Sequence, residues 1–227
     1  MQRVRVKIEG LLDPTTAVKV AQMGADAIGM VFAESPRRIA PELARAITDI
    51  LPPWVATVGV FVNEDPDVIN RVVEKSKIGY VQLHGDEAPD VVAKICAPCI
   101  KAFAVRDANW LGEVREWVAA VSVPSNLAAV LLDAYAPDVR GGSGRQFNWD
   151  MVADARAAGA MAGLDPIILA GGLDSSCVSR AIDLVQPWAV DVASGVESSP
   201  GVKDIRKIED FIRETREGDI LKTNLWL

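Results

Sequence analysis

The sequence predicts an α/β fold in which strands and helices alternate along the whole chain. Short runs rich in β-branched residues recur at intervals of roughly 20–30 residues. These eight runs cover residues 3–9, 26–32, 55–62, 79–83, 99–105, 128–133, 166–170 and 189–193. Segments with helical periodicity lie between them, over residues 41–50, 66–76, 108–121, 149–158 and 175–184. Eight such units fit the closure of a parallel sheet into a (βα)8 TIM barrel.

An open doubly wound sheet is the alternative fold. That fold would carry its glycine-rich turn after the first strand. Here the glycine-rich turns follow the seventh and eighth strands instead. Helix starts are indicated at Asp13-Pro14, at Asp65-Pro66 and at Asp174-Ser175-Ser176. We therefore expect one barrel domain over residues 1–217 and a tail over residues 218–227, whose apolar residues can pack on the barrel or on a partner.

Composition limits the function classes. The 227 residues carry 24 Lys and Arg against 31 Asp and Glu, a formal net charge of −7. An acidic chain of this kind argues against binding to nucleic acid or to anionic membranes. Its three cysteines are too few for a disulfide framework and favour a reducing compartment, so we expect a cytoplasmic protein. The first residues alternate polar and apolar side chains and do not resemble a secretion signal.

The cysteines and the single histidine do not indicate a metal site. Cys96 and Cys99 have the spacing of a redox pair, but they are placed between the fourth and fifth strands, at the end of the barrel away from the expected site. His84 is the only histidine, and such a residue is more often a hydrogen-bonded structural side chain than a metal ligand. We therefore expect no metal.

The active site of a barrel forms where its strands end. Gly171 and Gly172 follow the seventh strand, and Ser194 and Gly195 follow the eighth. Glycines allow the backbone to approach a phosphate closely, and helix N-termini offer free N–H groups. We predict a phosphate site in these two loops. The glycine-rich segment 141–145 lacks a P-loop ending and is interpreted as a lid.

Charged side chains at other strand ends supply candidates for catalysis. Glu9 and Asp133 end the first and sixth strands, and two carboxylates across one site can act as base and acid. Arg37 follows the second strand and can hold a substrate carboxylate by bidentate hydrogen bonds. Polar groups that point into a barrel must be paired, so we also expect an interior network that includes Lys7 and Asp191.

Several motifs in one order resemble the phosphoribosylanthranilate isomerase family of tryptophan biosynthesis. The resemblance runs from about residue 4 to residue 213 and rests on Val6-Lys7-Ile8-Glu9-Gly10-Leu11, Ser35-Pro36-Arg37, Val81-Gln82-Leu83-His84-Gly85, Leu131-Leu132-Asp133, Leu169-Ala170-Gly171-Gly172-Leu173 and Val190-Asp191-Val192-Ala193-Ser194-Gly195-Val196-Glu197. It implies a cofactor-free (βα)8 barrel that catalyses an Amadori rearrangement of a phosphorylated small molecule, as a monomer or a homodimer.

The resemblance also implies residue roles. Asp133 would be the general acid, Arg37 and His84 would contact the substrate, and the backbones around Gly172, Ser194 and Gly195 would hold the phosphate. The family's base is a cysteine, and Glu9 stands at that position here. Leu12 likewise replaces a threonine that is usual in the family.

Three functions are compatible with Glu9. In the first, Glu9 replaces the cysteine as base, since a carboxylate can remove a proton next to an imine. In the second, the barrel binds a phosphorylated ligand without catalysing this reaction, because a misplacement near 1 Å costs on the order of 100-fold in rate. In the third, two carboxylates isomerise a different phosphorylated sugar. Like-charge repulsion between Glu9 and Asp133 would also favour the neutral form of one of them.

Overall fold

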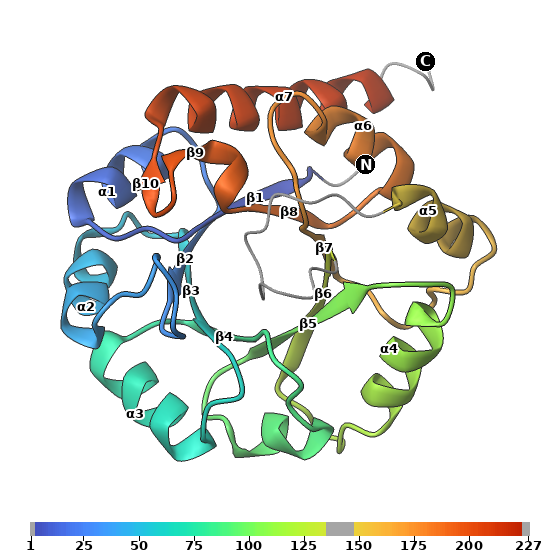
Figure 1. The fold of residues 1–227 in the computed structure, drawn as a ribbon, viewed down its shortest axis with the longest axis horizontal. Helices are drawn as coiled ribbons and strands as arrows, with labels where there is room; N and C mark the ends of the chain where they lie inside the picture. The colour runs from blue at the N-terminus through green and yellow to red at the C-terminus, as the bar shows by residue number, and fades with distance from the viewer. Residues whose placement is uncertain (1–2, 135–147, 224–227) are drawn as a thin grey trace.

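The computed structural model describes residues 3–134 and 148–223, with side chains through residue 217. Eight parallel strands form a closed barrel in chain order (Figure 1). Their bounds are β1 (Arg5–Glu9), β2 (Ala27–Val31), β3 (Ala56–Phe61), β4 (Tyr80–Leu83), β5 (Cys99–Val105), β6 (Leu127–Ala134), β7 (Ile167–Leu169) and β8 (Ala189–Val192). Pairing of β1 with β8, with Lys7 opposite Asp191, closes the barrel. The barrel prediction is confirmed, and the open doubly wound alternative is wrong.

Helices surround the strands (Figure 1). They are α1 (Pro14–Gln22), α2 (Pro41–Ile50), α3 (Pro66–Ser76), α4 (Trp110–Ala119), α5 (Trp149–Ala157), α6 (Val178–Val185) and α7 (Ile205–Thr223). Two short 3-10 helices, η1 (Pro89–Lys94) and η2 (Ser194–Val196), and a hairpin of β9 (Glu197–Ser199) and β10 (Val202–Lys203) complete the described part of the chain. α7 runs across residue 217, which we took as the end of the barrel domain.

The predicted helix starts at the first two aspartates are confirmed. Asp13 accepts a hydrogen bond from the backbone of Thr16, and Asp65 accepts one from Asp67, with a proline opening each helix. Asp174 instead caps a turn, because its side chain accepts from the backbone of Ser176, and α6 begins only at Val178.

The helix expected between the fourth and fifth strands is wrong in type. Only η1, a 3-10 helix, lies there. The residues directly after β4 form a loop, in which Glu87 accepts hydrogen bonds from the backbones of Asn63 and Gly85. Residues 88–98 then lead from this loop to β5, and η1 takes up Pro89–Lys94 of them.

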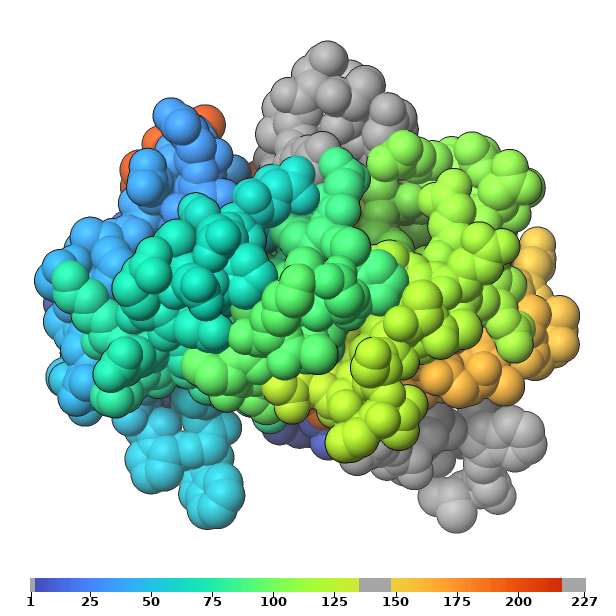
Figure 2. All heavy atoms as spheres, turned by 90° about the horizontal axis from the view of Figure 1, so that it is seen from below, coloured from blue at the N-terminus to red at the C-terminus, as the bar shows by residue number. Residues whose placement is uncertain are grey.

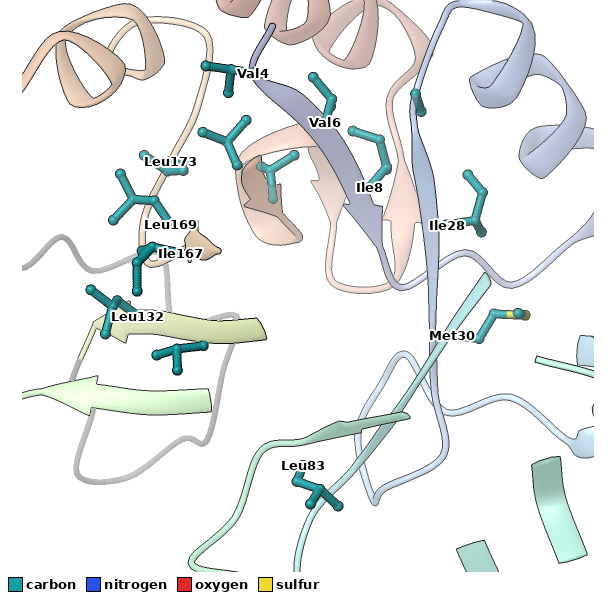
Figure 3. Packing of buried hydrophobic residues seen from close by; sticks show 14 of the residues in the cluster. Val4, Val6, Ile8, Ile28, Met30, Leu83, Leu132, Ile167, Leu169 and Leu173 are labelled. Carbon is teal, nitrogen blue, oxygen red and sulfur yellow. The ribbon is translucent and has the colours of Figure 1, made fainter. Parts of the chain in front are cut away.

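Alternation along each strand divides the apolar side chains into two layers. Val6 and Ile8 project from β1 into the layer between strands and helices, as do Leu132 and Leu169 from β6 and β7 (Figure 3). A smaller cluster fills the barrel interior with Val58, Ile100, Ala102, Ala129, Leu131, Ile168, Ala170 and Ala189. The polar side chains inside the barrel therefore pack on a layer of apolar side chains.

The end of the barrel at which the strands begin carries an exposed loop and a buried cysteine. Figure 2 shows the barrel from the side, with the cyan segment that joins α2 to β3 projecting from the end at which the strands begin. Trp54 in this loop is 98% exposed. Cys99 opens β5 at the same end, and burial raises the pKa of its thiol to about 12, so a reactive thiolate is disfavoured there.

Of the helices in the described ranges, none combines the length and apolarity that crossing a bilayer requires.

Candidate active site

One cavity at the carboxyl ends of the strands brings together most of the predicted site residues. It is lined by the side chains of Glu9, His84, Asp133 and Asp191 and by the loops that follow β7 and β8, including Gly171, Gly172, Ser194 and Gly195. The candidate carboxylates and the two glycine-rich loops thus face the same space. Arg37 is not among the residues that line this cavity.

Glu9 belongs to a buried ion network inside the barrel. Lys7 Nζ donates to Glu9 Oε2 at 2.6 Å, to Asp191 Oδ2 at 2.7 Å and to Gln82 Oε1 at 2.9 Å. Gly29 of β2 makes room for this network, since a Cβ there would lie 3.0 Å from Glu9 Cγ and 3.1 Å from Lys7 Cε. The predicted pairing of Lys7 with Asp191 is confirmed.

The shared ammonium sets the charge of the two carboxylates. Burial raises the pKa of Glu9, but the positive charges of Lys7 and His84 outweigh this and lower it to about 2. Burial raises the pKa of Asp191 to about 7, with Lys7 opposing the rise and Glu9 adding to it. Glu9 is therefore ionised, and Asp191 is the carboxyl that gains a proton more readily.

The expected repulsion between Glu9 and Asp133 does not raise the pKa of Glu9. The Lys7 ammonium, 2.6 Å from Glu9, dominates its surroundings instead. The sequence could not show this balance, because Lys7, Asp191 and His84 approach Glu9 only in the closed barrel.

A chain of hydrogen bonds fixes the tautomer of His84. Because Lys7 donates to Gln82 Oε1, the Gln82 amide nitrogen faces Glu9 Oε2 at 3.3 Å and His84 Nδ1 at 2.8 Å. Nδ1 then accepts, so Nε2 carries the hydrogen and donates to Asp133 Oδ2 at 3.0 Å. His84 therefore orients Asp133.

Asp133 also changes the pKa of His84. Burial lowers the pKa of His84, but the hydrogen bond to Asp133 and its charge outweigh this and raise it above its ordinary value. The Gln82 amide disfavours a proton on His84 Nδ1, because that proton would face the N–H groups of Gln82. Ala134 N donates to the other Asp133 oxygen at 2.7 Å, which fixes the carboxylate plane.

Gly171 allows the loop after β7 to pass close to Asp133. Its φ is +85°, and a Cβ at this position would lie 2.4 Å from the backbone nitrogen of Ala134 and 3.0 Å from Asp133 Oδ1. Gly172 follows, also with positive φ. The loop after β8 continues into η2, where Ser194 and Gly195 line the cavity. These two loops form the predicted phosphate side of the cavity.

Arg37 is held by a partner that the sequence did not reveal. Its Nε and Nη2 donate to the two oxygens of Glu197 at 2.8 and 2.7 Å, and Lys203 Nζ donates to the same carboxylate at 2.8 Å. Burial raises the pKa of Glu197, but hydrogen bonds from Arg37 and Lys203 outweigh this and lower it. Glu197 opens β9, so the hairpin after the eighth strand fixes the guanidinium.

A second buried pair steadies the loop that carries His84. Lys101 Nζ donates to Glu87 Oε2 at 3.0 Å and to the backbone oxygen of Gly85 at 2.7 Å. This pair joins β5 to the loop after β4 and was not predicted, because nothing in the sequence links residues 87 and 101. The predicted lid at residues 141–145 falls outside the described residues.

Comparison with known proteins gives consistent matches. Residues 6–214 match the family model described as N-(5′phosphoribosyl)anthranilate (PRA) isomerase. A protein of Trichlorobacter lovleyi named N-(5′-phosphoribosyl)anthranilate isomerase is 45% identical over 215 residues, which cover 94% of this chain and 98% of that protein. One of the same name from Geobacter sulfurreducens is 44% identical over 214 residues, covering 94% and 98% of the two chains.

Solved structures of similar proteins match the fold closely. The phosphoribosyl anthranilate isomerase of Thermotoga maritima is 37% identical, with a TM-score of 0.83, and the match covers 94% of this chain and 99% of that one. A further solved structure, of a phosphoribosyl anthranilate isomerase 36% identical with a TM-score of 0.80 and the same coverage, is described as a complex with reduced 1-(o-carboxyphenylamino)-1-deoxyribulose 5-phosphate.

Proposed function

Because the chain belongs to the N-(5′-phosphoribosyl)anthranilate isomerase family of tryptophan biosynthesis, we propose that Glu9 and Asp133 carry out the proton transfers of this family's reaction. The reaction is an Amadori rearrangement of N-(5′-phosphoribosyl)anthranilate to 1-(2-carboxyphenylamino)-1-deoxyribulose 5-phosphate. It needs an acid to open the sugar ring and a base to remove a proton from C2′. The cavity presents one candidate for each role.

Asp133 delivers a proton to the ring oxygen, the ring C–O bond breaks, and the nitrogen lone pair forms the imine. The source of this proton is the pair of Asp133 and His84, whose nearest atoms are 3.0 Å apart. The total charge of the pair is the same whether this proton is on His84 or on Asp133. The raised pKa of His84 supports storage of a proton in this pair near neutral pH.

Glu9 then removes the C2′ proton, the C2′–H electron pair forms the C1′–C2′ double bond, and the imine nitrogen is neutralised. Ionisation of Glu9 by Lys7 keeps the base available at neutral pH. Lys7 faces two carboxylates, so with Asp191 ionised the three groups carry one excess negative charge. Because Asp191 takes up a proton more readily than Glu9, Glu9 stays ionised as the base. The resulting enolamine tautomerises to the ketone.

Arg37 and the two glycine-rich loops bind the ends of the substrate. Glu197 occupies one edge of the Arg37 fork, so the anthranilate carboxylate would meet the remaining N–H groups. The backbones of Gly172, Ser194 and Gly195 hold the phosphate, consistent with the position of phosphate sites in many barrels. We propose a cytoplasmic enzyme that acts as a monomer or a homodimer; one solved structure from Thermotoga maritima is described as generated monomers of a dimeric relative.

The observation that carries this proposal is the placement of Glu9 and Asp133 on one cavity with the two glycine-rich loops. The test is the fluorescence decay of freshly made phosphoribosylanthranilate with the parent protein and with Glu9→Gln, Glu9→Cys and Asp133→Asn. We expect turnover by the parent and a 100- to 10,000-fold lower kcat for Glu9→Gln and Asp133→Asn, about the range of general acid and base effects. An inert parent that gains activity as Glu9→Cys would refute the role of Glu9.

A further inference from the structure

Asp191 has a buried oxygen that no described group satisfies. It lies on β8 opposite Lys7, is 6% exposed and lines the same cavity as Glu9. Its Oδ2 accepts from Lys7 at 2.7 Å, whereas Oδ1 has no hydrogen-bond partner within residues 3–134 and 148–217. A buried acceptor without a donor is costly and rare, and here it lies in a site built to receive a ligand.

The chemistry of the substrate limits what can satisfy Asp191 Oδ1. The phosphate and the anthranilate carboxylate are anionic, and a second carboxylate would repel both. The sugar hydroxyls are donors, and a carboxylate accepts from them strongly. Glu9 and Asp191 are bound to one ammonium, at 2.6 and 2.7 Å, and both residues line the same cavity. The carbon that Glu9 deprotonates carries such a hydroxyl.

We propose that Asp191 contacts the substrate directly, with Oδ1 accepting the hydrogen bond of the hydroxyl on C2′. This inference rests on the proposed function, because it takes Glu9 as the base at C2′. The contact holds the C2′ hydroxyl on one side and thereby turns the C2′ hydrogen toward Glu9. Lys7 then positions both carboxylates at C2′, Glu9 at its hydrogen and Asp191 at its hydroxyl.

Two ligands that differ only at C2′ provide the test. The reaction product has a ketone there and offers no donor, whereas its reduced form has a hydroxyl. We measure Kd for both by calorimetry at about pH 8, because burial raises the pKa of Asp191 to about 7 and the carboxylate must predominate. The parent should bind the reduced form, in its better-binding C2′ epimer, at least about 10-fold more tightly, as expected for a hydrogen bond to a charged group.

Asp191→Asn is the test variant and Glu9→Gln its matched control. Each removes one of the two carboxylate charges that Lys7 faces. Asp191→Asn should abolish or reverse the preference for the reduced form, because its amide can donate to the ketone. Glu9→Gln should retain the preference. Binding of inorganic phosphate, measured in each variant, should stay within about threefold of the parent, which shows that the folded phosphate site persists.

The proposal is overturned if Asp191→Asn keeps the parent's preference, or if Glu9→Gln loses it while Asp191→Asn does not. If Asp191→Asn does not fold, Asp191→Ser, with its shorter neutral side chain, takes its place with the same expectation. Turnover separates the two proposals. A parent that turns over substrate without the preference contradicts the role of Asp191 alone, whereas an inert parent with the preference contradicts the proposed function alone.

Discussion

Replacement of Lys7 by methionine tests the ion network most severely. Lys7 is 2% exposed and is the ammonium between Glu9 and Asp191. Burial lowers its pKa, but the two carboxylates outweigh this and raise it, so Lys7 is charged in the folded chain. Methionine has similar length and no charge. It leaves two carboxylates buried together without a counterion.

The expected loss of unfolding free energy at pH 7 is about 3–5 kcal/mol, the cost of removing one member of a buried ion pair. Without Lys7 the folded chain must retain an additional proton on this pair. Stability relative to the parent then falls as pH rises, by up to about 1.4 kcal/mol per pH unit for each proton retained. The loss should therefore be about 3 kcal/mol smaller at pH 5 than at pH 7.

Urea unfolding followed by far-ultraviolet circular dichroism at both pH values measures this effect. Lys94→Met is the matched control, because Lys94 makes a 2.8 Å ion pair with Asp90 on the surface, where both side chains are more than half exposed. Surface pairs contribute about 0–1 kcal/mol, so this control should change little. An equal loss at pH 5 and pH 7, or a loss for Lys7→Met no larger than that of Lys94→Met, would refute the reasoning.

Three further perturbations follow from the site. Gly171→Ala should lower kcat/KM about 100-fold, because its Cβ would meet the backbone of Ala134 at 2.4 Å; Gly159→Ala, with φ +70° and nothing near its Cβ, should cost about 1 kcal/mol of stability and leave turnover unchanged. Arg37→Lys should raise KM about 10-fold or more in steady-state assays through loss of the bidentate fork; a KM equal to the parent's would contradict the carboxylate contact. The pKa of His84 is raised on folding, so its charged form adds stability that is complete below its ordinary pKa and is lost as pH rises through the raised value. Relative to His84→Gln, the parent's unfolding free energy in urea should therefore fall as pH rises above the ordinary histidine pKa of about 6.5, and a constant difference would argue against this ion pair.

Periodicity predicted much of the fold because each strand and helix depends mainly on local pattern. The runs over 41–50 and 66–76 coincide with α2 and α3, since proline opens each of them and the apolar spacing is helical. The 3-10 helix before β5 was missed. It follows the loop in which Glu87 bonds to Asn63 and Lys101, and these contacts form only in the folded chain.

The candidate site shows the same division. The predicted interior network of Lys7 and Asp191 is present, and Glu9 belongs to it as well. Sequence reasoning missed Glu197 as the partner of Arg37, because the two residues are 160 positions apart and meet only when the last hairpin folds over the second loop. The hint available in the sequence was the carboxylate of Glu197, which stands two residues after Gly195.

The measurement that tests the central claim most directly is the single-turnover rate of freshly made phosphoribosylanthranilate carrying hydrogen or deuterium at C2′, compared between the parent and Glu9→Gln. If Glu9 removes the C2′ proton, deuterium should slow the parent several-fold. Glu9→Gln should then be 100- to 10,000-fold slower with either isotope. A parent rate that is insensitive to deuterium, or a Glu9→Gln rate within about threefold of the parent, would contradict the assignment of Glu9 as the base.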